Sequence, residues 1–247
     1  MFARLSLTAL LFTASFISST ALGSDTVYAG GGTLPQIVDG GGTKTTITLI
    51  NLDDVPAPYT LYFYDDNGNP LAMSTTAGAP ASILSGTLDS RGSVTIKTNG
   101  GGATTLQGWA LLVTENTIAG TAVFGIPING SYAEASSNLD TGANTKFGLP
   151  FDGTTSVTGV AIANSWLPTP LVIGLTVYDL HGNQLLTDTI VLPGNGHTSF
   201  LLAARYPQLA TQQGFAVFSG SYDMNVLGLR ATGNTFTSLT PVVASGW

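Results

Sequence analysis

The chain carries the same pattern twice in the same order, and this repeat constrains its fold more than any other feature. Four blocks of the first copy have counterparts in the second: residues 38–51 in 151–164, 61–69 in 175–183, 108–110 in 214–216, and 123–126 in 226–229. The offset between counterparts lies between 114 and 103 residues, as insertions in loops would cause. A repeat of this length indicates two similar structural units of about 100 residues each.

Each copy has the residue pattern of short β-strands. In residues 45–51, Ile47 and Leu49 alternate with threonines, which predicts a strand with one buried face. A strand after it ends near Asn67-Gly68, a pair that favours a tight hairpin turn. Further strands are predicted at residues 93–97, 106–113, 120–126, 198–202, 214–218 and 225–230. About seven strands per copy predict an all-β fold of two tandem immunoglobulin-like β-sandwich domains.

We expect the first sandwich domain at residues 24–136, a linker at 137–145, and the second sandwich domain at 146–247. The one helical segment predicted is residues 203–209, which Pro207 weakens. An outer-membrane β-barrel is the rival all-β architecture. Pro241 interrupts the terminal segment and the predicted strands are short, so the pattern favours two closed domains.

Residues 1–23 have the pattern of a secretory signal peptide. A positive charge at Arg4 precedes an uncharged apolar run over residues 5–17, and Ala21-Leu22-Gly23 places small residues at the predicted cleavage site. An uncleaved membrane anchor is the alternative, but the apolar run is shorter than the ~20 residues that a spanning helix needs. The sequence therefore predicts a secreted protein beginning at Ser24, in the periplasm, at the cell surface or outside the cell, without a later transmembrane segment.

The composition excludes several classes of function. There is no cysteine, which excludes disulfides and thiolate metal sites. Removing Arg4 with the signal leaves six basic and fourteen acidic residues. Nucleic-acid binding needs clustered basic residues, so no nucleic-acid partner is expected. Charged residues make up only 9% of the chain, against about 25% in ordinary soluble domains.

No convergent catalytic set is visible, so we expect a protein that is not an enzyme and has no catalytic or cofactor-binding residues. His181 and His197 both fall in predicted turns, where a histidine is usually solvated, and neither has a histidine counterpart in the first copy. The chain has no Gly-x-Ser-x-Gly motif. The adjacent pairs Asp53-Asp54 and Asp65-Asp66 lie in loops or turns and are interpreted as solvated carboxylates. A Ser-His-Asp arrangement stays open, because such sites are recognised by geometry.

A calcium site is a weaker hypothesis for the turn that contains Asp65, Asp66, Asn67 and Asn69. These residues crowd oxygen donors around a glycine, and calcium prefers such ligands. The second copy replaces the cluster with Asp179, His181 and Asn183, and turn formation alone explains both sets. No metal site or cofactor is therefore expected.

Two tryptophans call for different interpretations. Trp109 lies in a predicted strand and aligns with Phe215, so we expect it in the core of the first sandwich. Trp166 lies in a predicted loop, where it is a candidate contact for a carbohydrate or protein, or a plug over the domain junction.

Several phrases of the sequence resemble a family of secreted, uncharacterised tandem β-sandwich proteins from environmental bacteria. The phrases are those at residues 44–49, 64–69, 120–124 and 159–164. The resemblance implies an exported tandem sandwich without an assigned activity, and it carries over no functional residue. The likeness to immunoglobulin and fibronectin type III domains is one of architecture only, which does not decide function.

Together these patterns predict a secreted, non-enzymatic structural, adhesion or interaction module with an unidentified protein or glycan partner. The alternatives are a carbohydrate-binding module that uses the loop around Trp166, and a small hydrolase. Few lysines guard the predicted strand edges, so homo-association through edge strands is a further expectation. Residues 24–42 are either a frayed terminus, the first strand of their own domain, or a strand that adds to a neighbouring sheet.

Overall fold

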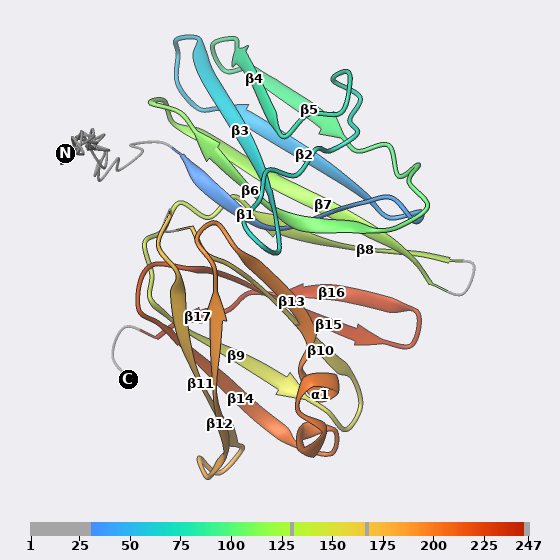
Figure 1. Cartoon of the computed structure of the whole chain (residues 1–247), viewed down its shortest axis with the longest axis vertical. Coiled ribbons are helices and arrows are strands. Elements are labelled where there is room, and N and C mark those ends of the chain that lie inside the picture. Colours follow the sequence, from blue (N-terminus) through green and yellow to red (C-terminus); the bar gives the residue numbers. More distant parts are fainter. Residues whose placement is uncertain (1–30, 129–130, 166–167, 245–247) are drawn as a thin grey trace, which may run out of the picture.

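The computed structural model describes residues 31–128, 131–165 and 168–244, and within these ranges the chain is all-β. The predicted signal peptide, residues 24–30 and Trp166 lie outside the described residues. The all-β prediction is confirmed, and the strands form two sets that lie one above the other along the long axis (Figure 1). We call residues 31–139 the first half and residues 144–244 the second half.

The first half contains eight strands: β1 (Gly32–Asp39), β2 (Lys44–Asn51), β3 (Ala57–Asp65), β4 (Ile83–Leu88), β5 (Ser93–Lys97), β6 (Leu106–Val113), β7 (Ile118–Ile128) and β8 (Ser131–Asn138). They form two antiparallel four-stranded sheets, with the orders β1-β6-β3-β4 and β5-β2-β7-β8. Both sheets are open and end in edge strands.

The second half contains the strands β9 (Lys146–Asp152), β10 (Val157–Ala163), β11 (Leu171–Asp179), β12 (Gln184–Leu192), β13 (His197–Leu201), β14 (Gln213–Gly220), β15 (Asn225–Thr232), β16 (Thr235–Leu239) and β17 (Val242–Val243). Their sheets have the orders β12-β11-β14-β9-β17 and β13-β10-β15-β16. If β9 is matched to β1 and so on in chain order, the two halves have the same strand order, and β17 is an addition at one edge.

Each half packs its two sheets around an apolar core of its own. In the first half, Ile47 and Leu49 on β2 are buried in one cluster with Leu61 and Phe63 on β3. The intervening threonines of β2 are less buried, so the alternation that the sequence shows is the alternation of the two sheet faces. The cores account for the sandwich arrangement, because a sheet with one apolar face must cover that face with another layer.

Helical structure is confined, among the described residues, to the connection between β13 and β14. The α-helix α1 spans Leu202–Arg205, and the 3-10 helix η1 follows it at Pro207–Leu209. Leu202 and Leu209 are buried in the core of the second half, so the two short helices close one end of that sandwich. Within the described ranges no helix has the length and apolarity needed to cross a membrane.

The two halves share buried surface. Strand β1 is buried along nearly its whole length, because one face joins the core of the first half and Val38 on the other face joins a second apolar cluster. That cluster combines Phe124 of the first half with Ala161 and Leu227 of the second. The halves are therefore joined by continuous packing, and not only by the chain between β8 and β9.

The separate cores lead to a testable prediction. Leu61→Ala and Leu175→Ala each remove a leucine that is fully buried in a different core. Each should lower the free energy of unfolding by about 2–5 kcal/mol, because the cavity adds to the lost transfer free energy. Thr187→Ala, at an exposed position of β12, is the control and should change it by less than about 0.5 kcal/mol. Urea unfolding measures all three, and leucine variants as stable as the control would contradict this packing.

Candidate functional site

A group of connected polar side chains joins the two halves, and it begins at the turn that follows β3. The Asp65 carboxylate accepts hydrogen bonds from the backbone N–H groups of Asn67 and Asn69, at 2.9 and 2.8 Å. Gly68 has a φ of 80°, which favours glycine. A Cβ atom at Gly68 would lie 2.0 Å from the carbonyl oxygen of Gly194 in the second half. The turn is thus shaped to let the second half approach closely.

The second half meets this turn with the segment between β12 and β13. Gly196 N–H donates to the Pro193 carbonyl at 2.9 Å, and Asn195 has a φ of 59°, so the segment is a tight turn. It delivers His197 to the Asp66 carboxylate, with 2.7 Å between His197 Nδ1 and Asp66 Oδ1. The His197 side chain is 0% exposed and that of Asp66 is 41% exposed.

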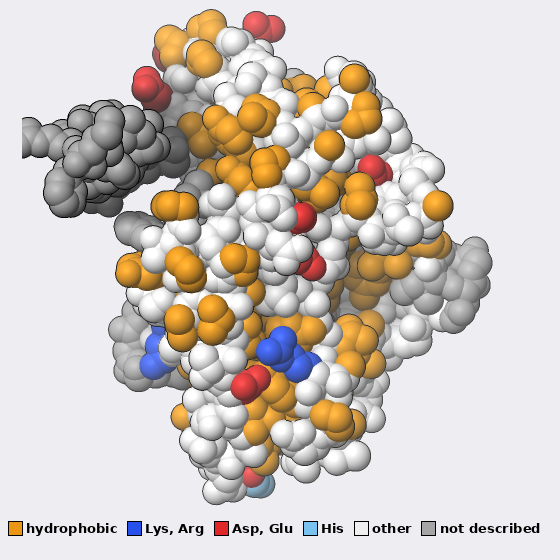
Figure 2. Space-filling model, viewed as in Figure 1, with side chains coloured by type: hydrophobic (Ala, Val, Ile, Leu, Met, Phe, Trp, Pro, Cys, Tyr) orange, Lys and Arg blue, Asp and Glu red, His pale blue; other side chains and the backbone are white. Residues whose placement is uncertain are grey.

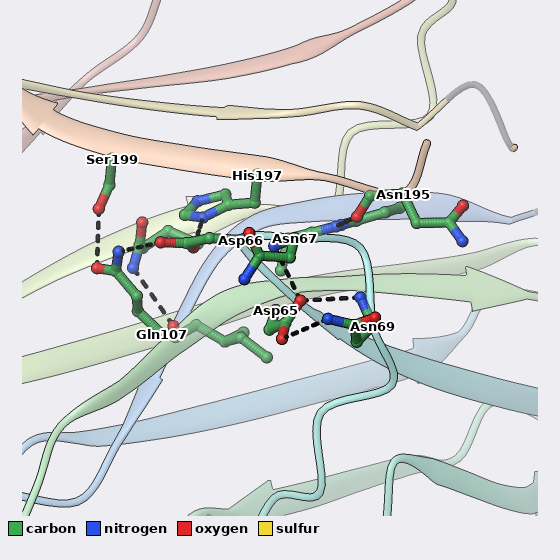
Figure 3. A network of polar contacts seen from close by, with 11 residues as sticks. Asp65, Asp66, Asn67, Asn69, Gln107, Asn195, His197 and Ser199 are labelled. Carbon is green, nitrogen blue, oxygen red and sulfur yellow. Dashed lines mark hydrogen bonds and ion pairs between the residues drawn. The ribbon is translucent and has the colours of Figure 1, made fainter. Parts of the chain in front are cut away.

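Two further side chains extend this contact into a network across both halves (Figure 3). Gln107 on β6 donates from Nε2 to Asp66 Oδ2 at 2.6 Å. The hydroxyl of Ser199 on β13 donates to Gln107 Oε1 at 2.9 Å. We call Asp66, Gln107, His197 and Ser199 the junction network. Two of its hydrogen bonds connect the halves, one between Asp66 and His197 and one between Gln107 and Ser199.

Trp109 strengthens the same junction and corrects a prediction. Its indole N–H donates to the Asn195 carbonyl at 2.7 Å, and its ring stacks on Tyr64 with 5.1 Å between centroids. The side chain is fully buried, but its cluster contains Ala163 of the second half and none of the core of the first. Trp109 therefore does not lie in the sandwich core as expected. It lies on the outer face of its sheet, which the second half covers.

His197 corrects a second prediction. The sequence places it in a turn, where a solvated side chain was expected, but the structure buries it at the first position of β13 against Asp66. The expectation failed because burial here comes from the other half of the molecule, which local pattern does not reveal. Asp66, interpreted as a solvated carboxylate, is likewise half-covered and is bonded across the junction to His197.

The surroundings of Asp66 set its charge state. Burial acts to raise the pKa of its carboxyl group, but the hydrogen bonds from His197 and Gln107, together with the charge of His197, outweigh burial, and the pKa lies below its usual value. Asp66 therefore stays ionised over a wider acidic range, and the network keeps a negative charge at its centre.

The junction network contains an aspartate, a histidine and a serine, so its geometry can be compared with that of a Ser-His-Asp catalytic site. In a Ser-His-Asp site the imidazole nitrogen opposite the aspartate must lie within hydrogen-bond reach of a hydroxyl. Here His197 Nε2 is buried and has no hydrogen-bond partner among the described residues. The nearby Ser199 hydroxyl is bonded to Gln107 instead. The structure thus brings an aspartate and a histidine together, and it uses the serine to extend the link between halves.

The calcium hypothesis finds an alternative explanation in the turn itself. Both oxygens of Asp65 accept hydrogen bonds from N–H groups of the same turn, including Asn69 Nδ2 at 3.2 Å from Oδ2. Asp179 makes the same bonds in the second half, with Asn183 and with the backbone N–H of His181. No group of three or more His, Cys, Asp or Glu residues suited to a metal ion occurs within the described parts of the chain.

The other adjacent pair of carboxylates, Asp53 and Asp54, lies in the loop between β2 and β3. Asp53 accepts the N–H of Thr117 at 2.8 Å, and this bond helps to hold its pKa below the usual value. Asp54 is exposed. The candidate contact residue Trp166 lies outside the described residues.

Two of the hollows on the described surface are relevant to binding. One, of about 350 Å³, lies along the junction, where residues of both halves line it, among them Gln36, Phe124, Phe200 and Leu229. The other, of about 570 Å³, lies on the β5-β2-β7-β8 sheet and is lined by residues that include Lys44, Asn99, Tyr132 and Glu134. Figure 2 shows few charged side chains on the face in view and apolar ones spread over both halves.

Sequence reasoning missed the junction network, but a signal was present. Asp66 aligns with Leu180, Trp109 with Phe215, and His197 with Ser93. Positions where a repeat departs in chemical type are candidates for contacts that only one copy makes. Comparison of the chain with protein-family models, curated proteins and solved structures finds no match.

The Trp109 contact gives a testable prediction. Trp109→Phe keeps an aromatic ring but removes the N–H that bonds the Asn195 carbonyl, so a buried acceptor loses its partner. The free energy of unfolding should fall by about 1–3 kcal/mol. Denaturant unfolding measures it, and a variant as stable as the wild type would show that this bond does not hold the halves together.

The Asp66 carboxylate gives a prediction about pH. Its pKa is lower in the folded chain, so its stabilising effect is present above the unfolded value and is lost as pH falls through the folded value. Asp66→Asn should therefore reduce stability at neutral pH, and the difference from wild type should shrink below about pH 4. Thermal unfolding across this range measures it. Asp54→Asn is the control, and a deficit in Asp66→Asn that does not vary with pH would contradict the prediction.

Proposed function

We propose that this protein is a secreted, non-enzymatic structural or interaction module. In this proposal the two halves are immunoglobulin-like sandwich domains that arose by internal duplication, residues 1–23 direct export, and the mature chain acts outside the cytoplasm. The equal strand order of the halves supports the duplication. The signal-like pattern of Arg4 and the apolar run after it supports export.

The observation that carries the proposal is the use of the reactive side chains. Two of the candidates for chemistry in the sequence, His197 and the Asp65-Asp66 pair, lie within or beside the junction network. The one nitrogen of His197 that could act as a base toward a substrate is buried. An enzyme needs such a group within hydrogen-bond reach of its substrate. Joining the halves is therefore the function that this geometry supports best.

Further contacts support a module that holds its halves in one orientation. Near the start of β1, whose other end lies beside Gln107, Asn225 Nδ2 donates to Oδ2 of Asp140, the residue that follows the first half, at 2.7 Å. The edge strands β8 and β16 also meet, where the Ser136 N–H donates to the Ser238 hydroxyl at 2.9 Å and that hydroxyl contacts the Ser136 carbonyl. A binding module gains from such rigidity, because fixed surfaces lose less entropy when a partner binds.

Carbohydrate binding is the second candidate, and one observation favours it. In the hollow on the β5-β2-β7-β8 sheet, Tyr132 is 47% exposed, and a Cβ atom at Gly125 would lie 2.1 Å from its ring. The ring therefore lies over Gly125, beside the charged Lys44 and Glu134. An exposed aromatic face among polar groups suits the apolar face of a sugar ring.

A single screen tests the proposal. The mature protein, beginning at Ser24, is assayed on generic esterase, protease and glycosidase substrates and on a glycan array, together with His197→Asn, His181→Asn and Tyr132→Ala. We expect no turnover by any of them. Turnover by the wild type that is lost in either histidine variant would overturn the non-enzymatic proposal. Glycan binding that is lost in Tyr132→Ala alone would favour the second candidate.

A further inference from the structure

The junction between the halves has two complementary sides. The first half contributes a receiving surface, made of the turn at residues 65–69 with Gln107 and Trp109 beside it. The second half contributes a projecting turn at residues 193–197, with Ser199 following on β13. Because the halves have the same strand order, each half also contains the counterpart of the turn that it does not use here, whereas β8 and β16 already meet within the chain.

The second half has a receiving surface built like that of the first. In the turn between β11 and β12, Asp179 accepts the N–H groups of His181 and Asn183, both at 2.8 Å. Gly182 has a φ of 82°, against 80° at Gly68, and no atom lies within 4 Å of a Cβ placed on it. The counterpart of the glycine that touches the other half therefore faces open space.

The aromatic pair beside this turn is also repeated. Tyr178 stacks on Phe215 with 5.1 Å between ring centroids and 22° between ring planes. The Tyr64–Trp109 pair of the first half has the same centroid distance and an angle of 26°. Gln213 occupies the place of Gln107, since it precedes the glycine of β14 as Gln107 precedes that of β6.

The first half has a projecting turn between β4 and β5, with the same backbone shape as the turn at residues 193–197. Arg91 has a φ of 57°, against 59° at Asn195, and these two are the non-glycine residues with positive φ in the described structure. The Gly92 N–H donates to the Asp89 carbonyl at 2.8 Å, and the corresponding bond in the second half is 2.9 Å. The turn is exposed, with Arg91 at its tip.

These two counterparts lie at opposite ends of the molecule. In Figure 1 the turn between β4 and β5 lies at the upper end of the long axis, and the turn between β11 and β12 lies at the lower end. At the lower end Leu180, which takes the place of Asp66, is 69% exposed, the largest value among the exposed large apolar residues of the described chain.

We propose that copies of this protein associate head to tail, with the turn between β4 and β5 of one copy seated on the turn between β11 and β12 of the next. The partner is thus a second copy of this chain, and the contact repeats the seating of one turn on the other, because the β8–β16 and Phe124–Leu227 contacts of the internal junction are already made within each chain. The inference rests on the proposed function as an interaction module. A contact between two different surfaces that does not close on itself yields an open filament.

The substitutions between the counterparts fit this contact. Thr95 and Gln213 replace Ser199 and Gln107, so the hydroxyl-to-amide hydrogen bond can form again between copies. Leu180 brings an apolar side chain that would leave water on association.

Arg91 adds an attraction that the internal junction lacks. It takes the place of Asn195, which lies against the Tyr64–Trp109 pair, so in the next copy its guanidinium would face the Tyr178–Phe215 pair. A guanidinium over an aromatic face is a favourable arrangement.

The test uses the mature full chain and one variant at each end. Leu180→Asp places a charge in the proposed contact, and Arg91→Asp reverses the charge with a residue type that tolerates positive φ. Ile83→Asp, on the edge strand β4 and 52% exposed, is the control for edge pairing. Light scattering after size exclusion, over a wide range of concentration, gives the mass. The wild type and Ile83→Asp should exceed one chain, and each end variant should associate at least about tenfold more weakly.

Mixing the two end variants gives the sharper result. Each variant retains one intact end, so an equimolar mixture should form mainly a complex of two chains. A wild type that stays monomeric, association that persists in both end variants, or a mixture that stays monomeric would each overturn the inference. Circular dichroism and melting of every variant establish that it folds, and Arg91→Asn and Leu180→Ser replace any that does not. Turnover in the substrate screen would instead overturn the proposed function, so the two failures are distinguishable.

Discussion

The contact between His197 and Asp66 is the interaction on which the arrangement of the molecule depends. A buried imidazole needs a polar partner, and Asp66 supplies one from the other half. Removing either group would leave the other partly buried without its bond, a larger loss than the bond itself contributes. The relative position of the halves is therefore fixed by hydrogen-bond geometry, and the apolar clusters around Phe124 and Trp109 add the attraction that brings the surfaces together.

The fold could be predicted from the sequence to the extent that it is written in local patterns. Alternation in residues 45–51 and the Asn67-Gly68 turn lead directly to β2 and to the end of β3, because face and turn are local properties. The environment of Trp109 was predicted wrongly, because the covering of an outward face is not a local property. It continues the alternation of β6 on the outward face, and only the position of the second half decides that this face is covered.

The candidate site was harder to predict than the fold, because its members come from three separate stretches of chain. Asp66 and His197 are 131 residues apart in the sequence, and neither stretch signals the other. What the sequence does contain is the departure of each copy from the other at these positions. A repeat provides an internal reference. A charged residue in place of Leu180, or a tryptophan in place of Phe215, marks a surface that is covered by the other half in only one of the two copies.

The burial of β1 on both faces has a consequence for the order in which the chain acquires its structure. Synthesis proceeds from the N-terminus, and domains generally begin to fold as they emerge. The outward face of β1, with Val38, and the indole of Trp109 are covered by strands that are made much later. Until those strands exist, a nascent first half presents a water-exposed apolar stripe and an unpaired indole N–H. Chaperone binding to the partly synthesised chain would be concentrated on that stripe.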